Sequence, residues 1–276
     1  MFRTHPTTLE SFDDDAGPAL RREPILNQVL LGVVESMGAE PGRYAQGVRM
    51  IVVQDDATGE VGVAMQTPPH GALVSAAGDA VARELGRRFA DAHPEARTVY
   101  GAERAAHAFA GGAAGARARC TSRNGAFELR EVLPVPAAPG RARLAEPADA
   151  PLLQSWLDAF IEEALPAGAP KDPNGGARFA GNGRTWLWLG DGGDLVCMAG
   201  NARRVEGWWA ISYVYTPPAH RGRGYATALV AHMSRWALAG GARGCTLFAD
   251  LANPVSNRIY ERIGYRRMGT CVTMEW

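Results

Sequence analysis

The sequence predicts an α/β protein of two domains, in which a mixed central sheet is flanked by helices. Segments with the two-residue alternation of strands interchange with segments of helical periodicity along the chain. A length of 276 residues is sufficient for two ordinary domains. Residues 133–140 contain three prolines and one glycine, a composition typical of a linker. We therefore expect an N-terminal α/β domain at 1–134, a linker at 135–140 and a second domain at 141–276.

Each element follows from the local pattern. In the first domain, we expect helices at 24–37, 80–92 and 103–110. We expect strands at 48–54, 61–66, 73–75, 97–100 and 127–132. In the second domain, a helix follows Asp149, and a helical turn at 178–180 lies within a Pro/Gly-rich segment at 166–183. The strands of this domain are expected at 141–145, 185–189, 195–202, 211–216, 245–250 and 266–274. Its remaining helices are expected at 224–239 and 254–262.

The most informative stretch is residues 211–229, where a strand runs through an Arg/Gly loop into a helix. The first N–H groups of a helix lack internal partners and lie at its positive end. Gly222 and Gly224 let a ligand approach the main chain closely, and Arg221 and Arg223 add positive charge. The pattern favours a phosphate site, although an ordinary turn with exposed arginines fits the glycine content equally well. Neither a P-loop nor a dinucleotide fingerprint matches this spacing.

Two motifs in order carry a resemblance to a known family. Arg221, Gly224 and Ala226 form R-x-x-G-x-A, and Asn253, Tyr260, Gly264 and Tyr265 form N-x-x-x-x-x-x-Y-x-x-x-G-Y. Together with the element order of residues 141–276, they resemble the GNAT superfamily of N-acyltransferases. This resemblance implies a GNAT acyl-CoA N-acyltransferase fold for the second domain.

The resemblance also implies an activity and its residues. The expected function is acetyl-CoA-dependent transfer of an acetyl group to a primary amine of a small molecule or peptide, by direct attack in a ternary complex. Tyr260 would protonate the departing thiolate, although a buried packing role for its ring is the alternative. Asn253 would contact the coenzyme, cap the helix after it, or do both. The residues implied to bind acetyl-CoA are Val214, Tyr215, Thr216, Arg221, Gly222, Arg223, Gly224, Tyr225, Ala226, Thr227 and Asn253.

No general base emerges from the sequence. The position where one common GNAT pattern has Glu, five residues before Asn253, is Phe248. The carboxylates that remain as a base or in the acceptor site, each also readable as a solvated surface group, are Glu162, Glu163, Glu206 and Asp250. A water-relayed base or no base is equally compatible. Phe248 therefore keeps a second hypothesis open, a non-catalytic acyl-CoA-binding regulatory protein.

Composition excludes other classes of protein. The formal charge is zero, and no Lys/Arg cluster interleaved with aromatic residues stands out, so we expect no nucleic-acid partner. Without an apolar run of about 18 residues we expect no membrane segment, and the first 15 residues do not resemble a signal peptide. Four separated cysteines favour a cytoplasmic protein without a metal site. We expect a monomer or a homodimer.

The first half is expected to be a degenerate GNAT-like repeat. Its element order is compatible with the same fold, but the segment at 76–79, where the phosphate loop should lie, has no Arg. Asp79 would repel phosphate there and cap the helix. We therefore expect this half to bind no acyl-CoA and to pack on the catalytic half or shape its acceptor cleft.

Overall fold

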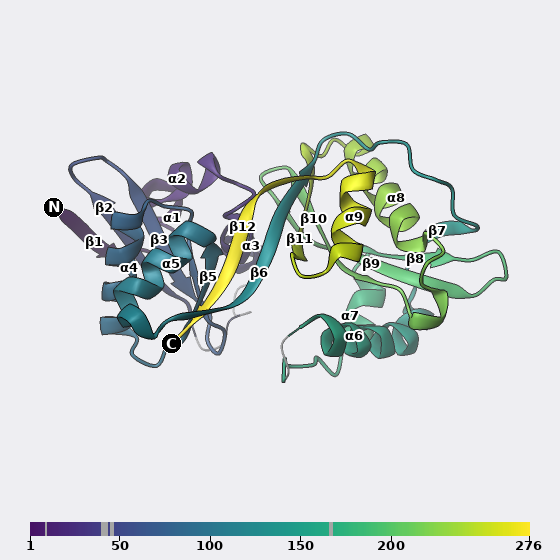
Figure 1. Ribbon diagram of the computed structural model, residues 1–276, viewed down its shortest axis with the longest axis horizontal. Coiled ribbons are helices and arrows are strands. Elements are labelled where there is room, and N and C mark those ends of the chain that lie inside the picture. Colours follow the sequence, from purple (N-terminus) through teal and green to yellow (C-terminus); the bar gives the residue numbers. More distant parts are fainter. Residues whose placement is uncertain (9, 40–43, 45–46, 166–167) are drawn as a thin grey trace. The chain divides into compact units, whose positions relative to one another are not determined.

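The computed structural model describes residues 1–8, 10–39, 44, 47–165 and 168–276, which form two compact units (Figure 1). The first unit consists of Met1–Phe127, Phe248–Pro254 and Arg267–Trp276, and the second of Glu128–Leu247 and Val255–Arg266. Strand β6 (Arg119–Leu129) leads from one unit into the other.

The units differ from the predicted domains because residues 128–134 belong to the second unit, whereas residues 248–254 and 267–276 belong to the first. Strand β12 (Arg266–Glu275) pairs antiparallel with β5 (Thr98–Ala102), which brings the chain end into the first unit. A pairing between segments so distant in sequence leaves no trace in local composition. The predicted domain division itself stays a prediction.

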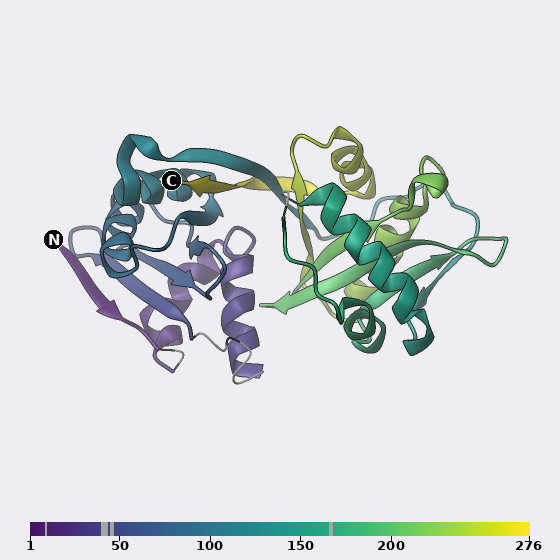
Figure 2. The same ribbon diagram turned by 90° about the horizontal axis from the view of Figure 1, so that it is seen from below.

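The sheet of the first unit follows chain order. Strands β1 to β4 pair antiparallel in sequence, and β4 pairs parallel with β5. The bounds of these strands are Phe2–Pro6, Arg49–Asp55, Val61–Gln66 and Ala72–Val74. Helices α4 (Asp79–Ala92) and α5 (Glu103–Ala114) cover one face. The helices on the other face are α1 (Phe12–Asp15), α2 (Gly17–Arg22) and α3 (Gln28–Ala39) (Figure 2).

The core of the first unit lies between its sheet and α4 and α5. Val81, Leu85 and Phe89 recur at four-residue spacing along α4, as an amphipathic helix requires, and all three are buried. They pack with Phe109 from α5 and with Val272 from β12.

The second unit repeats the pairing pattern of the first. Strands β7 to β10 pair antiparallel in sequence and β10 pairs parallel with β11. The bounds of β7 to β11 are Arg141–Leu144, Thr185–Leu189, Leu195–Val205, Trp208–Tyr215 and Gly244–Asp250. Its helices are α6 (Ala150–Ala164), α7 (Gly175–Gly181), α8 (Tyr225–Ala239) and α9 (Pro254–Ile263).

Alternation along the strands separates the two faces of this sheet. Leu187 packs with the buried residues of α6 and α7, whereas the neighbouring Trp186 contacts His232 of α8, with ring centroids 4.9 Å apart. Helix α8 therefore lies on the face opposite α6 and α7, as Figure 1 shows. The connection from β10 to α8 joins these layers, and it holds the Arg/Gly loop.

Candidate functional site

The site begins where strand β10 leaves its parallel neighbour. Its pairing with β11 covers only Trp208 to Ala210, although β10 continues to Tyr215. The register with β9 shifts twice after Ala210, and Tyr213 adopts a φ of +52°. Among the described residues, none of 211–215 pairs with β11. This edge of β10, which includes Val214 and Tyr215, thus offers main-chain groups to an extended ligand.

A loop with two left-handed glycines connects β10 to α8. Gly222 has φ +76° and Gly224, the N-cap of α8, has φ +81°. A Cβ added to Gly222 would meet no atom within 4 Å. Both glycines are therefore required by the backbone rather than by close packing, and the space beside Gly222 is open.

The main chain at this corner presents a run of donors. Within the described chain, the N–H groups of residues 222–227 have no hydrogen-bond acceptor, and the first bond of α8 joins the Ala228 N–H to the Gly224 carbonyl at 3.0 Å. Arg223 is exposed and forms no ion pair with a described residue. Donors, helix dipole and cation together favour a bound anion.

Arg221 has a different role from Arg223. Its guanidinium lies 2.5 Å from the Glu163 carboxylate and donates to the Thr216 carbonyl at 2.9 Å. The Tyr215 hydroxyl donates to the other Glu163 oxygen at 3.3 Å. The structure thus gathers the predicted residues Glu163, Tyr215, Thr216 and Arg221 into one cluster, in which Arg221 ties the loop to the end of α6.

Tyr260 lies on α9 near Cys197 of β9, with 8% of its surface exposed. Burial, and secondly the charge of nearby Cys197, raises its pKa above the ordinary value. The Thr216 hydroxyl donates to Cys197 Sγ at 3.3 Å, and burial raises the pKa of the Cys197 thiol to about 12. Tyr260 therefore keeps its proton at neutral pH. Sequence patterns did not single out Cys197, because its thiol approaches Thr216 only through the pairing of β9 with β10.

The other predicted carboxylates and Asn253 have local surroundings of their own. Glu206 occupies the turn before β10, at the opposite end of that strand from Tyr215, and adopts φ +51°. Glu162 pairs with Lys171. Asp250 accepts the Ala252 N–H at 2.9 Å through Oδ1 and the Asn253 N–H at 3.0 Å through its carbonyl, in the turn before α9.

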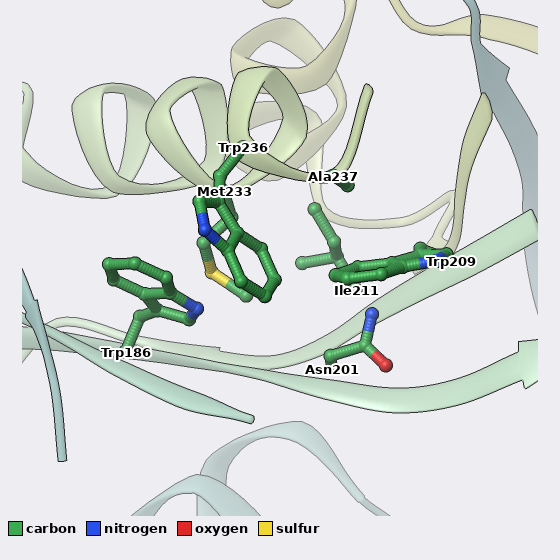
Figure 3. Close-up of a pocket in the computed structure, with 7 residues that line it drawn as sticks. All are labelled: Trp186, Asn201, Trp209, Ile211, Met233, Trp236 and Ala237. Atoms are coloured by element: carbon green, nitrogen blue, oxygen red, sulfur yellow. The ribbon is translucent and has the colours of Figure 1, made fainter. Parts of the chain in front are cut away.

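Tryptophans line a small pocket elsewhere in the second unit. Figure 3 shows Trp186, Trp209 and Trp236 around a small pocket whose floor includes Asn201. The Trp236 ring lies 5.3 Å from that of Trp186 and 4.9 Å from that of Trp209, both edge-on. Trp236 is three helical turns from Gly224, roughly 17 Å along α8. Most of the aromatic side chains on these strands serve packing: Trp186, Trp188 and Trp208 are buried.

Two searches of the described residues bear on other functions. No group of three or more His, Cys, Asp or Glu side chains among them has the arrangement of a metal site. None of the helices there combines the length and apolar character that crossing a bilayer demands.

The fold matches that of known acetyltransferases along the whole chain. An acetyltransferase of the GNAT family from Colwellia psychrerythraea superposes with a TM-score of 0.62 at 10% identity, covering 100% of this chain and 99% of that one. A GCN5-related N-acetyltransferase from Sphaerobacter thermophilus gives a TM-score of 0.65 at 16% identity, covering 100% of this chain and 95% of that one. A tandem GNAT protein from the clavulanic acid biosynthesis pathway gives a TM-score of 0.56 at 14% identity, covering 99% of this chain and 98% of that one. The likeness defines a GNAT fold.

The sequence itself identifies the domain. Residues 150–265 match the model of the acetyltransferase (GNAT) family, so this chain contains a GNAT acetyltransferase domain in its second half. A search of curated proteins finds no match. The predicted fold class and the resemblance to the GNAT superfamily are both confirmed. A GNAT-like first half agrees with the whole-chain match to the tandem protein.

Proposed function

We propose that this protein is an N-acetyltransferase that uses acetyl-CoA to acetylate a primary amine of a small molecule or peptide, by direct attack in a ternary complex. The observation that carries the proposal is the main-chain donor run of residues 222–227 beside Arg223. The negative charge of a diphosphate suits these donors, and the open space at Gly222 lets it approach. Family membership of residues 150–265 supports the same assignment.

The coenzyme arm fits the free edge of β10. Val214 to Thr216 follow the residues that pair with β11, so their main-chain groups suit a strand-like contact with the pantetheine amides. A main-chain N–H at this edge is also suited to stabilise negative charge on the acyl oxygen. Residues 221–227 and Asn253 complete the proposed binding set, with Arg221 acting through the shape of the loop.

Acetyl-CoA supplies an activated thioester, and the protein supplies a proton for the departing thiolate. Tyr260 is the proposed donor, since burial keeps its hydroxyl protonated. Glu163 is the proposed carboxylate for the acceptor side, because it meets Tyr215 and Arg221 at the loop. Glu162 instead pairs with Lys171, Glu206 lies at the opposite end of β10, and Asp250 accepts the Ala252 N–H in the turn before α9.

A binding experiment tests the proposal. Reversing the charge of Arg223 with Arg223→Glu places a carboxylate beside a diphosphate, and we expect coenzyme affinity to fall about 100-fold by isothermal calorimetry. Arg235→Glu, on the exposed side of the same helix, makes the same change in net charge and controls for it. Equal acetyl-CoA affinity in wild type and Arg223→Glu would reject the site.

One observation favours a second function, that of a non-catalytic acyl-CoA-binding regulator. Phe248 places an aromatic ring 6.4 Å from that of Tyr100, where one common GNAT pattern has a carboxylate. Thiol release from acetyl-CoA across a panel of primary amines distinguishes the two, because a regulator would bind the coenzyme and release none.

The cellular setting is also part of the proposal. Four free cysteines, three of them buried, favour a reducing compartment such as the cytoplasm. We further propose that the protein acts as a monomer or homodimer.

A further inference from the structure

The corner that joins β4 to α4 in the first unit is the counterpart of the Arg/Gly corner in the second. In each, an antiparallel strand is followed by a helix and then by a parallel strand. Each helix has glycine at its N-cap, Gly78 in α4 and Gly224 in α8. The first intrahelical bonds also correspond, joining the Ala82 N–H to the Gly78 carbonyl and the Ala228 N–H to the Gly224 carbonyl. The two corners therefore share the position in the fold, the N-cap glycine and the first helical bond, although Gly78 is extended and Gly224 is left-handed.

Side chains of the protein itself fill the first of these corners. The Gly78 N–H donates to Glu60 Oε1 at 2.7 Å, and the Ala76 N–H donates to Asn27 Oδ1 at 2.7 Å. Asn27 is 2% exposed and is held in turn by its Nδ2, which donates to the Leu20 carbonyl at 3.0 Å. By contrast, residues 222–227 of the second unit receive no such side chain within the described structure.

The Glu60 carboxylate lies directly against the backbone of the loop. A Cβ added to Gly78 would lie 2.9 Å from Glu60 Oε2 and 3.1 Å from Oε1. A side chain at 78 would therefore displace the Glu60 carboxylate, although the φ of −67° is open to any amino acid. A carboxylate at a helix N-terminus makes the charge interaction that a bound phosphate would make.

Asp79 does not cap α4, contrary to the expectation from the sequence. The N-cap is Gly78, with no side-chain cap, and Asp79 forms an ion pair with Arg104 at 2.6 Å. Asp79 is instead the first residue of α4, and its carboxylate turns to Arg104 of α5.

We propose that Glu60 is a built-in anion that occupies the phosphate position of the first unit, so that each chain binds one coenzyme, in the second unit. The count of one coenzyme rests on the proposed function, whereas the role of Glu60 does not. In the first unit a side chain of the protein, rather than a ligand, then meets the main-chain donor before the helix.

Chemical rescue tests the role of Glu60. Glu60→Ala leaves the Gly78 N–H without an acceptor, and we expect the midpoint of thermal unfolding to fall by on the order of 5 °C. Millimolar inorganic pyrophosphate should restore most of that loss, beyond the shift it causes in wild type. Asp56→Ala removes a carboxylate from the adjacent turn, where Asp56 pairs with Arg3, and should gain no such response. An unchanged midpoint, or no added response to pyrophosphate in Glu60→Ala, would overturn the role of Glu60.

Calorimetric stoichiometry tests the count. We expect one acetyl-CoA per wild-type chain, and two would overturn the inference that the first corner is closed. A stoichiometry of zero would overturn the proposed function, while the pyrophosphate response would still decide the role of Glu60.

Discussion

Two neighbouring tyrosines separate a chemical role from a structural one. Tyr260 and Tyr265 lie with ring centroids 6.0 Å apart, and both are buried. The Tyr265 hydroxyl shares a hydrogen bond of 2.9 Å with Ser234 Oγ, which also donates to the Val230 carbonyl. Phenylalanine at either position keeps the ring and removes one hydroxyl. The two substitutions therefore form a matched pair.

The expected effects differ in kind. Tyr265→Phe loses the hydrogen bond to Ser234 and the weaker one to Cys245, about 1 kcal/mol of unfolding free energy, because Ser234 keeps its second partner. Tyr260→Phe removes the proposed proton donor, and general acid catalysis contributes 10²- to 10⁴-fold in typical enzymes. We therefore expect kcat to fall at least about 100-fold, equivalent to about 2.7 kcal/mol in activation free energy. Coenzyme affinity should change little.

The pH dependence adds a further constraint. Burial, and secondly the charge of Cys197, raises the pKa of Tyr260, so its hydroxyl stays protonated as pH rises through 9. Any loss of activity between pH 6 and 9 should therefore be the same in shape for wild type and Tyr260→Phe.

Thiol release at saturating acetyl-CoA, with the best acceptor from a panel of primary amines, measures kcat, and thermal unfolding measures stability. A kcat of Tyr260→Phe within twofold of wild type would remove Tyr260 from the mechanism. An equal loss of kcat in Tyr265→Phe would show that the effect belongs to packing rather than to proton transfer.

Three further predictions concern the scaffold. Gly224→Ala forces an L-residue into φ +81°. The nearest atom to the added Cβ is Ala138 Cβ at 4.0 Å, so the cost comes from the backbone and not from a clash. We expect a loss of about 1–2 kcal/mol of unfolding free energy by urea titration, and unchanged stability would contradict this account. Leu187→Ala, at a fully buried position, should cost about 2–5 kcal/mol in the same assay, and a cost below 1 kcal/mol would show that the core under α6 and α7 is loosely packed. The Arg143 guanidinium beside Asp149 lowers the pKa of that carboxyl below its usual 3.8, so its contribution to stability is present above pH 4 and disappears as pH falls through the lowered value. The difference in unfolding midpoint between wild type and Asp149→Asn should thus be full at pH 7 and shrink below pH 4, and a difference that does not vary with pH would refute the ion-pair account.

Much of the second half could be predicted because its local signals agree with its tertiary structure. The strand at 185–189 has the predicted bounds, and α8 begins one residue after the expected start at Gly224. The two-glycine loop is the strongest signal, because backbone at positive φ restricts residue type directly. The motifs around Gly224 and Tyr260 therefore identified the family from sequence, and the position of the Arg/Gly loop followed from it.

The features that escaped prediction depend on contacts between distant segments. Strand β1 and helices α1 and α2 are short and lack a clear period, so their existence depends on packing. Helix α3 begins at Gln28 rather than at residue 24, because residues 24–27 form a turn. The pairing of Arg221 with Glu163, the contact of Thr216 with Cys197 and the approach of Glu60 to Gly78 all join residues far apart in sequence. The spacing of residues along the sequence gives no sign of these contacts.

The resonances of the loop amides give the most direct test of the central claim, that main-chain donors at the start of α8 bind the diphosphate of a coenzyme. In ¹⁵N-labelled protein titrated with acetyl-CoA, we predict the largest amide shifts at residues 222–227, with no comparable shift at Ala76 and Gly78 in the first unit. Saturable coenzyme binding that leaves the amides of residues 222–227 unshifted would contradict the account.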